Sequence, residues 1–172
     1  MTDALLHAER RRPLVRSLTA GEIALALEVF GKTIDLGRVR IWRAPWPLVR
    51  AFVAGNWFGR SWIIWPGRSE VPDFSKGPMG LQAILIHELV HIWQAQQGVN
   101  LLFAKIKAGD SVASYTYPVS DSCHWDLLNI EQQAMVVEHR FRLSRGLRVP
   151  ADTSFYERVC PLGSEKSGKI IT

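Results

Sequence analysis

The sequence predicts an α+β fold, a compact domain in which two long helices and a small sheet share one core. Three observations support this prediction. No charged residue except Glu88 falls between Leu81 and Trp93, so the helix predicted over residues 78–97 looks apolar nearly all round and therefore buried. Residues 121–145 carry an apolar stripe at helical spacing. Residues 38–43 alternate between apolar and basic side chains, and residues 61–65 are mostly β-branched and aromatic, as in strands.

The first elements are a capped helix and two strands. Thr19 and Glu22 have the spacing of a capping box, so we expect a helix from there to Phe30. The alternation in residues 38–43, RVRIWR, predicts a half-buried strand. Residues 61–65 form a second strand between glycine and proline. This strand is either plain sheet core or the wall of a cleft that pairs with an extended peptide.

The central helix carries the motif HELVH. Pro78 suits its first turn and Gly98 its end. On a helix His87 and His91 lie four residues apart and project from one face, while Glu88 is set aside from them. This is the HExxH arrangement of zinc hydrolases, and a chain of this composition would contain roughly 0.007 chance copies of it. The motif therefore predicts a zinc site.

Two other interpretations of the motif stay open. Burying three polar side chains without partners costs about 1 to 3 kcal/mol for each unsatisfied group, and a metal ion with a water would satisfy them all. Histidines of a core helix can also hydrogen-bond to neighbouring backbone. A metal site that has lost its activity is a separate alternative.

Downstream of the central helix the sequence predicts a short helix, a strand and a second long helix. The pattern of Leu101–Lys107 is helical, and residues 111–119 contain two tyrosines at strand-like spacing. The long helix starts at Asp121 or Ser122, both good capping residues, and ends before Gly146.

These elements divide the chain into three parts. Residues 1–17 are expected to be a basic, flexible tail. Residues 18–148 form the domain that carries the motif. Residues 149–172 form a C-terminal extension, which we expect to be partly disordered because it is polar and irregular.

Composition limits the partners and the cellular compartment that we expect for this chain. The net charge is +5, but no nucleic-acid-binding motif surrounds the basic residues, so we expect no nucleic acid partner. Cys123 and Cys160 form neither a CxxC pair nor a disulfide framework, although one bridge between them stays an alternative. The sequence shows no export signal and no membrane span. A reduced, cytoplasmic location is therefore expected.

Catalytic zinc usually has three protein ligands, so a third must be found beyond the two histidines. The metzincin extension HExxHxxGxxH fails, because Gln94 and Gln97 occupy its glycine and last histidine positions. The search then moves to the second long helix, where Glu131 is the first choice and Glu138 the second. Glu138 would otherwise orient a ligand histidine. Both lie on the predicted buried stripe, formed by Leu127, Ile130, Ala134, Val137 and Phe141.

A family resemblance rests on four segments: HELVHIWQAQQG, NIEQQAMVVEH, SLTAGEIALALEVFG and DLGRVRIWR. Together they resemble the Vgr-related proteins found near bacterial secretion genes, which are similar to the zincin-like core domain of extracellular contractile injection systems. The resemblance covers most of residues 17–145. It implies a compact zincin-like domain with a gluzincin-type site, in which Glu131 takes the position of the third zinc ligand.

Two residues depart from this pattern. Met135 stands where many gluzincins carry an acidic residue, four positions after the ligand glutamate. His139 follows Glu138 where the Vgr-related pattern has an aspartate. Both departures concern the surroundings of the ligands.

The functional hypothesis is a zinc metallopeptidase. Zn²⁺ held by His87, His91 and Glu131 would activate a water molecule that attacks a peptide bond. Glu88 would take a proton from that water and deliver it to the leaving amine. The expected partners are a peptide or protein substrate and, from the resemblance, components of a secretion system. Export by a contractile injection route is then expected instead of a signal peptide.

The reaction also needs a donor to the tetrahedral oxyanion. Tyr115, Tyr117 and His124 lie between the ligand segments and are the candidates, with Tyr117 named as the catalytic one. The rival hypothesis is a zinc-stabilised module without activity that docks onto a secretion assembly, for which the seven tryptophans could form a partner surface. A cell-wall-directed or immunity-like hydrolase is a third possibility.

Overall fold

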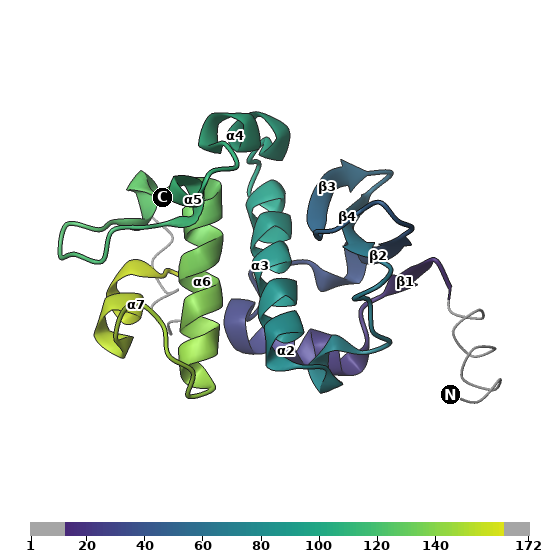
Figure 1. Cartoon of the computed structure of the whole chain (residues 1–172), viewed down its shortest axis with the longest axis horizontal. Helices are drawn as coiled ribbons and strands as arrows, with labels where there is room; N and C mark the ends of the chain where they lie inside the picture. The colour runs from purple at the N-terminus through teal and green to yellow at the C-terminus, as the bar shows by residue number, and fades with distance from the viewer. Residues whose placement is uncertain (1–12, 164–172) are drawn as a thin grey trace.

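The structure is a computed structural model that describes residues 13–163. Its elements form three layers (Figure 1): a small sheet on one side, helix α3 (Met79–Gln96) in the middle, and helix α6 (Ile130–Ser144) on the other side. Helix α2 (Ala20–Phe30) crosses behind one end of α3. The fold is therefore α+β, as predicted, with six α-helices in the described residues.

The sheet has four strands in the order β1-β2-β4-β3. Strands β2 (Val39–Ala44) and β4 (Arg60–Pro66) are parallel, and they confirm the two predicted strands. Strand β3 (Phe52–Trp57) forms a hairpin with β4 and lies at the sheet edge. It escaped prediction because its sequence lacks alternation and contains a bulge between Val53 and Gly55.

The remaining strand, β1 (Val15–Ser17), lies within the segment that we expected to be a tail and pairs antiparallel with β2. Arg16 accounts for its position. The guanidinium donates to both oxygens of Glu22 at 2.8 and 2.9 Å, and to Glu70 at 3.0 Å. Because Glu22 is fully buried, these contacts tie the strand to α2. Residues 1–12 of the expected tail lie outside the described residues.

The N-terminal helix and the central helix follow the sequence predictions closely. Thr19 and Glu22 form the predicted capping box at the start of α2. Helix α3 begins after Pro78 and ends two residues before Gly98, and its inner face is buried against the sheet and α6. The predicted buried central helix is therefore confirmed.

The second long helix begins later than predicted. Asn129, not Asp121 or Ser122, caps α6, because its side chain accepts hydrogen bonds from the backbone of Glu131 and Gln132. The preceding residues form a 3₁₀ turn, Trp125–Leu127. Leu127 was predicted on the buried stripe, but it precedes the helix and is 77% exposed.

Three shorter helices complete the described chain. Helix α4 (Leu101–Ala108) confirms the predicted short helix. The strand predicted within residues 111–119 is wrong, since Val112–Tyr115 forms the single helical turn α5, capped by Ser111. Helix α7 (Thr153–Val159) was not predicted, and it lies within the expected C-terminal extension, of which residues 164–172 are outside the described residues. Further 3₁₀ turns are Leu36–Arg38 and Phe74–Lys76.

The state of the cysteines and the character of the helices bear on two expectations from the sequence. Cys123 and Cys160 are both buried and free of a disulfide. Among the described residues, no helix has the length and apolar character that would let it cross a membrane.

Candidate metal centre

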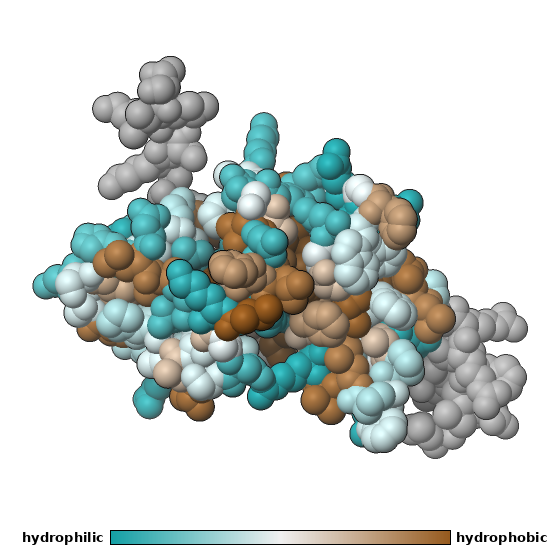
Figure 2. All heavy atoms as spheres, turned by 90° about the horizontal axis from the view of Figure 1, so that it is seen from above, coloured by the Kyte–Doolittle hydropathy of each residue, from teal (hydrophilic) through white to brown (hydrophobic). Residues whose placement is uncertain are grey.

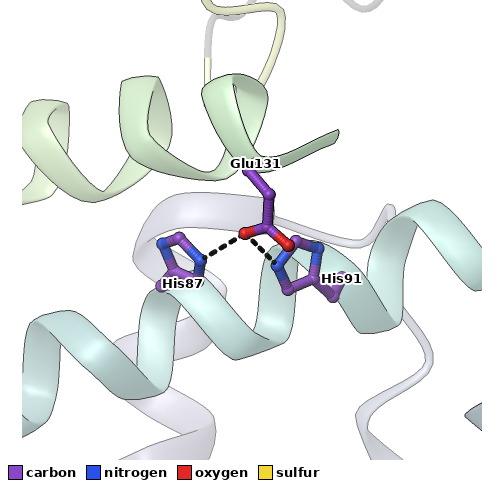
Figure 3. A group of neighbouring side chains, drawn as sticks. All are labelled: His87, His91 and Glu131. Atoms are coloured by element: carbon purple, nitrogen blue, oxygen red, sulfur yellow. Dashed lines mark hydrogen bonds and ion pairs between the residues drawn. The ribbon is translucent and has the colours of Figure 1, made fainter. Parts of the chain in front are cut away.

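Three side chains from the two long helices converge in the space between these helices (Figure 3). His87 and His91 project from α3 and Glu131 projects from α6 towards them. Glu131 Oε2 lies 3.3 Å from His87 Nε2 and 3.2 Å from His91 Nε2. The structure thus brings together all three residues that the sequence nominated as zinc ligands.

Local structure explains the convergence. The four-residue spacing places both imidazoles on the face of α3 that packs against α6. The cap at Asn129 fixes the first turn of α6, so that Glu131, its second residue, faces α3. The site therefore depends on one helix for two donors and on the packing of a second helix for the third.

The geometry and burial of these donors fit a zinc ion. Zinc bonds of 2.0 to 2.2 Å in a tetrahedron separate the ligand atoms by roughly 3.3 Å, close to the separations observed here. The second oxygen of Glu131, Oε1, is buried and finds no hydrogen-bond partner among the described residues. Lys105 Nζ lies 3.4 Å from it, at an ion-pair distance without the alignment of a hydrogen bond. A cation between the three donors would satisfy this carboxylate.

Glu138 contacts the ring nitrogen of His87 that does not face Glu131. Its Oε2 lies 3.1 Å from His87 Nδ1, and its Oε1 pairs with Arg142 at 2.7 Å. Burial raises the pKa of Glu138, but its contacts with His87 and then Arg142 outweigh burial and lower that pKa. The ionised carboxylate can only accept, so His87 Nδ1 carries a proton and Nε2 is left to face Glu131. Glu138 therefore contacts one of the two candidate ligand histidines, which is the alternative position that the sequence suggested for it.

The electrostatics of the cluster favour positive charge. Burial lowers the pKa of His87, but hydrogen bonds to Glu131 and Glu138 and the nearby Glu88 outweigh burial and raise the pKa to about 9. Burial raises the pKa of Glu131, yet its hydrogen bonds to His87 and His91 hold that pKa well below its usual range. In the absence of a metal a proton on His87 therefore serves as the compensating charge.

His91 has a partner that sequence reasoning missed. Gln94 Oε1 lies 2.8 Å from His91 Nδ1, and the Gln94 side chain is almost fully buried. In the sequence this glutamine counted only as a departure from the metzincin pattern. A long polar residue three positions after the second histidine, on the buried face of the helix, was the available signal.

A cavity of about 340 Å³ opens beside the three donors. Glu88 lines it, and the Oε2 atom of this residue is buried without a hydrogen-bond partner among the described residues. The rest of the lining is largely apolar and includes Val49, Ala51, Trp65, Pro66, Leu81, Ile84 and Met135. A carboxylate that lines a cavity and has an oxygen without a partner is available to accept a proton.

The three candidate oxyanion donors occupy different surroundings. Tyr115 lines the cavity, with its ring stacked 6.5 Å from that of His87 and its hydroxyl donating to Asp110 at 3.0 Å. Tyr117, named as the catalytic candidate, does not line the cavity. Its buried hydroxyl is instead held by His139 at 2.6 Å and Tyr156 at 2.8 Å. His124 is exposed and also absent from the lining.

The absence of the expected strand explains why Tyr115 lines the cavity and Tyr117 does not. Residues 115 and 117 were assumed to share one face of a strand, but the chain leaves helix α5 between them. The two tyrosines therefore point into different environments, and position in the chain could not distinguish them.

Comparisons with known proteins identify relatives of this domain. No protein-family model matches the chain. The chain is 33% identical, over an alignment of 139 residues, to the type VI secretion system spike protein VgrG2b of Pseudomonas aeruginosa. This alignment takes in 73% of the chain but 13% of the spike protein, so the similarity concerns one part of a much longer relative.

A solved structure corresponds to that part. The effector domain of Pseudomonas aeruginosa VgrG2b superposes on the chain with a TM-score of 0.61 and 31% sequence identity. The match covers 76% of this chain and 75% of the effector domain. Sequence and structure agree on the relationship, and they support the Vgr-related resemblance. The chain therefore belongs to the family of the VgrG2b effector domain.

Proposed function

We propose that the chain is a zinc-dependent peptidase that acts as an effector of a type VI secretion system. The observation that carries the proposal is the convergence of His87, His91 and Glu131 beside a cavity that Glu88 also lines. This set provides three ligands and leaves one side open, as catalytic zinc sites do. When bound, zinc supplies Lewis acidity and makes water a nucleophile near neutral pH.

Glu88 is the proton carrier in this proposal. It lines the cavity, and its buried Oε2 has no hydrogen-bond partner among the described residues, so the carboxylate can take a proton from the attacking water. The same carboxylate then delivers that proton to the nitrogen of the leaving amine. Glu88 is no part of the ligand cluster, so it remains free for both transfers.

Tyr115 is the donor to the oxyanion in this proposal, in place of Tyr117. Burial, the charge of Glu131 and the hydrogen bond to Asp110 raise the pKa of Tyr115 well above its usual value. The phenol is then protonated throughout the neutral range and can donate a hydrogen bond. Donation to a substrate oxygen would replace the present donation to Asp110.

Delivery by a secretion apparatus is proposed from the relatives. One of them is a type VI secretion spike protein, and the domain matched in it is an effector domain. We propose that this domain travels by the same kind of route, either as part of a longer protein or bound to a spike. Its substrate would then be a peptide or protein in the recipient compartment.

A zinc-stabilised docking module is the second candidate, and one observation favours it. Seen from the α4 end, hydrophobic residues gather over the middle of the molecular face (Figure 2). The side chains of Leu102, Phe103 and Ile106 on α4 are each at least 69% exposed. Exposed apolar clusters of this kind are common at binding surfaces. The open cavity at the metal centre favours the enzyme, because a purely structural site needs none.

The decisive experiment compares the wild type with Glu88→Gln. Both proteins should bind about one equivalent of zinc, because Glu88 is not a ligand. Only the wild type should hydrolyse a denatured protein substrate, since glutamine cannot carry the proton. Equal hydrolysis by the two proteins would reject the mechanism, and zinc binding without hydrolysis by either would favour the docking module.

A further inference from the structure

We infer that Gln94 and Gln133 form a relay that fixes the tautomer of His91 and locks α3 onto α6, so that the metal centre is preformed. The two glutamines link the two helices directly beside the ligand cluster. Gln94 lies on α3, three residues after His91, and Gln133 lies on α6, two residues after Glu131. This inference rests on the proposed zinc site and assigns its positioning residues.

The direction of the relay follows from the backbone carbonyls at its two ends. Gln133 Nε2 donates to the carbonyl of Trp125 at 3.2 Å, so Gln133 Oε1 must point to Gln94. Gln94 Nε2 donates to that oxygen at 2.8 Å and to the carbonyl of Ile130 at 3.1 Å. A carbonyl oxygen can only accept. Neither amide can therefore be reversed without placing two acceptors against each other.

This direction determines which nitrogen of His91 carries the proton. With both amide hydrogens used, Gln94 presents its Oε1 to His91 Nδ1 at 2.8 Å. An oxygen in that position needs a donor, so the neutral ring is protonated at Nδ1. Nε2 is then unprotonated and faces the ionised Glu131 Oε2, 3.2 Å away, so this tautomer is the one that suits a cation between the two acceptors. The opposite tautomer would place acceptor against acceptor at Gln94 and turn an N–H towards the metal position.

The same relay sets the position of the third ligand. Gln94 bonds to the carbonyl of Ile130, the residue directly before Glu131. The first turn of α6 is thereby tied to α3 at the point where Glu131 enters the cluster. Gln94 is 1% exposed, so water does not compete for these contacts. One buried side chain thus orients a histidine ligand and aligns the helix that supplies the carboxylate.

The two histidines are held by different devices. His87 is held by Glu138, an ionised acceptor. His91 is held by a neutral amide whose orientation is imposed from α6. In both cases an acceptor at Nδ1 leaves Nε2 facing Glu131. The amide of Gln94 thus does for His91 what the carboxylate of Glu138 does for His87.

The test measures zinc affinity by competition with a chelator, and the exchange of the His91 Nδ1–H proton with water by ¹⁵N NMR of the zinc-loaded protein. Gln94→Met keeps the size of the side chain and removes its polar atoms. We expect its zinc affinity to fall about 10- to 100-fold and its Nδ1–H proton to exchange faster than in the wild type, because that proton loses its acceptor.

Gln82→Met is the matched control. Gln82 also lies on α3, and its amide also donates to two backbone carbonyls, those of Ser75 and Gly77. It is not part of the cavity lining. Zinc affinity should change less than about threefold in this variant, because outer contacts matter only where they touch a ligand. A loss as large as that of Gln94→Met would overturn the inference.

Gln133→Met covers the case in which Gln94→Met does not fold. It leaves Gln94 in place but frees its amide to reverse, so zinc affinity should fall and the Nδ1–H proton of the zinc-loaded protein should again exchange faster. Unchanged zinc affinity and exchange in both methionine variants would overturn the inference. Failure of the proposed function is distinguishable, because a wild type without peptidase activity can still show these changes, and an active peptidase can lack them.

Discussion

His87 Nδ1 lies 3.1 Å from Oε2 of Glu138, a residue seven positions beyond Glu131 on the same helix. Two turns of α6 thus place one carboxylate in front of the metal position and the other behind a ligand. The arrangement lets a single helix supply a donor and orient a donor of its neighbour.

The first prediction concerns Glu138. Replacement by Gln should weaken zinc binding about 10- to 100-fold without abolishing it, because the His87 ring loses its charged acceptor while all three ligands remain. Chelator competition measures the effect. Glu131→Gln is the reference for loss of a ligand and should bind zinc far more weakly still. Equal affinities for the wild type and Glu138→Gln would contradict the assigned contact.

The second prediction concerns pH and metal removal. The pKa of His87, raised to about 9 in the metal-free protein, exceeds its ordinary value of 6.5. Protonated His87 therefore contributes stability that is complete below pH 6.5 and is lost as pH rises to about 9. The chelator-treated protein should lose unfolding free energy across this window, by at most about 1.4 kcal/mol per pH unit.

Zinc-loaded protein should lack this decline, because the metal takes the place of the proton. Zinc binding at neutral pH should accordingly release a proton, and its affinity should rise with pH until His87 is neutral. Urea unfolding at several pH values and calorimetry in buffers of different ionisation enthalpy provide the two measurements. A flat pH profile of the metal-free protein would be inconsistent with the charged His87.

The third prediction separates Tyr115 from Tyr117. Tyr115→Phe should lower kcat roughly 10²- to 10³-fold with zinc affinity retained, because it removes a donor that faces the cavity. Tyr117→Phe should leave kcat nearly unchanged and reduce stability by about 1 to 3 kcal/mol, since His139 and Tyr156 lose a buried partner. Peptide hydrolysis and thermal unfolding test both variants, and the reverse pattern would restore Tyr117 as the catalytic tyrosine.

The fourth prediction concerns the buried ion cluster at β1. Glu22→Gln should destabilise the fold by about 1 to 3 kcal/mol, because Arg16 would keep Glu70 but lose the charged partner that accepts two of its hydrogen bonds. Glu28→Gln is the matched control on the same helix. Its side chain is 55% exposed and pairs with Arg145, so the change should remain below about 1 kcal/mol. Chemical denaturation compares the two.

Local sequence patterns were sufficient for the elements that define the site. The capping box at Thr19, the alternation in residues 38–43 and the apolar run of the central helix each act within a few residues. The histidine pair is equally local, since four residues always make about one helical turn. The choice of Glu131 used a longer pattern, and Glu131 faces both histidines although the helix start was misplaced, because helical phase is independent of where a helix begins.

Contacts between distant segments account for what the sequence left open. Strand β3 exists because it pairs with β4, and β1 exists because Arg16 meets Glu22 and Glu70. Gln94 can orient His91 only because α6 places the carbonyl of Ile130 and the side-chain amide of Gln133 beside it. None of these partners can be identified from the periodicity of a single segment.

The sequence by itself thus determined the two histidines, the carboxylate between them and the helix that presents them. The tertiary structure decided that Glu131 meets both histidines, that Tyr115 and not Tyr117 reaches the cavity, and which groups hold the imidazoles from behind. The physical reason is the range of the interactions. Helix periodicity is set by the local backbone, whereas the direction of a hydrogen bond or the lining of a cavity depends on segments that meet only after folding.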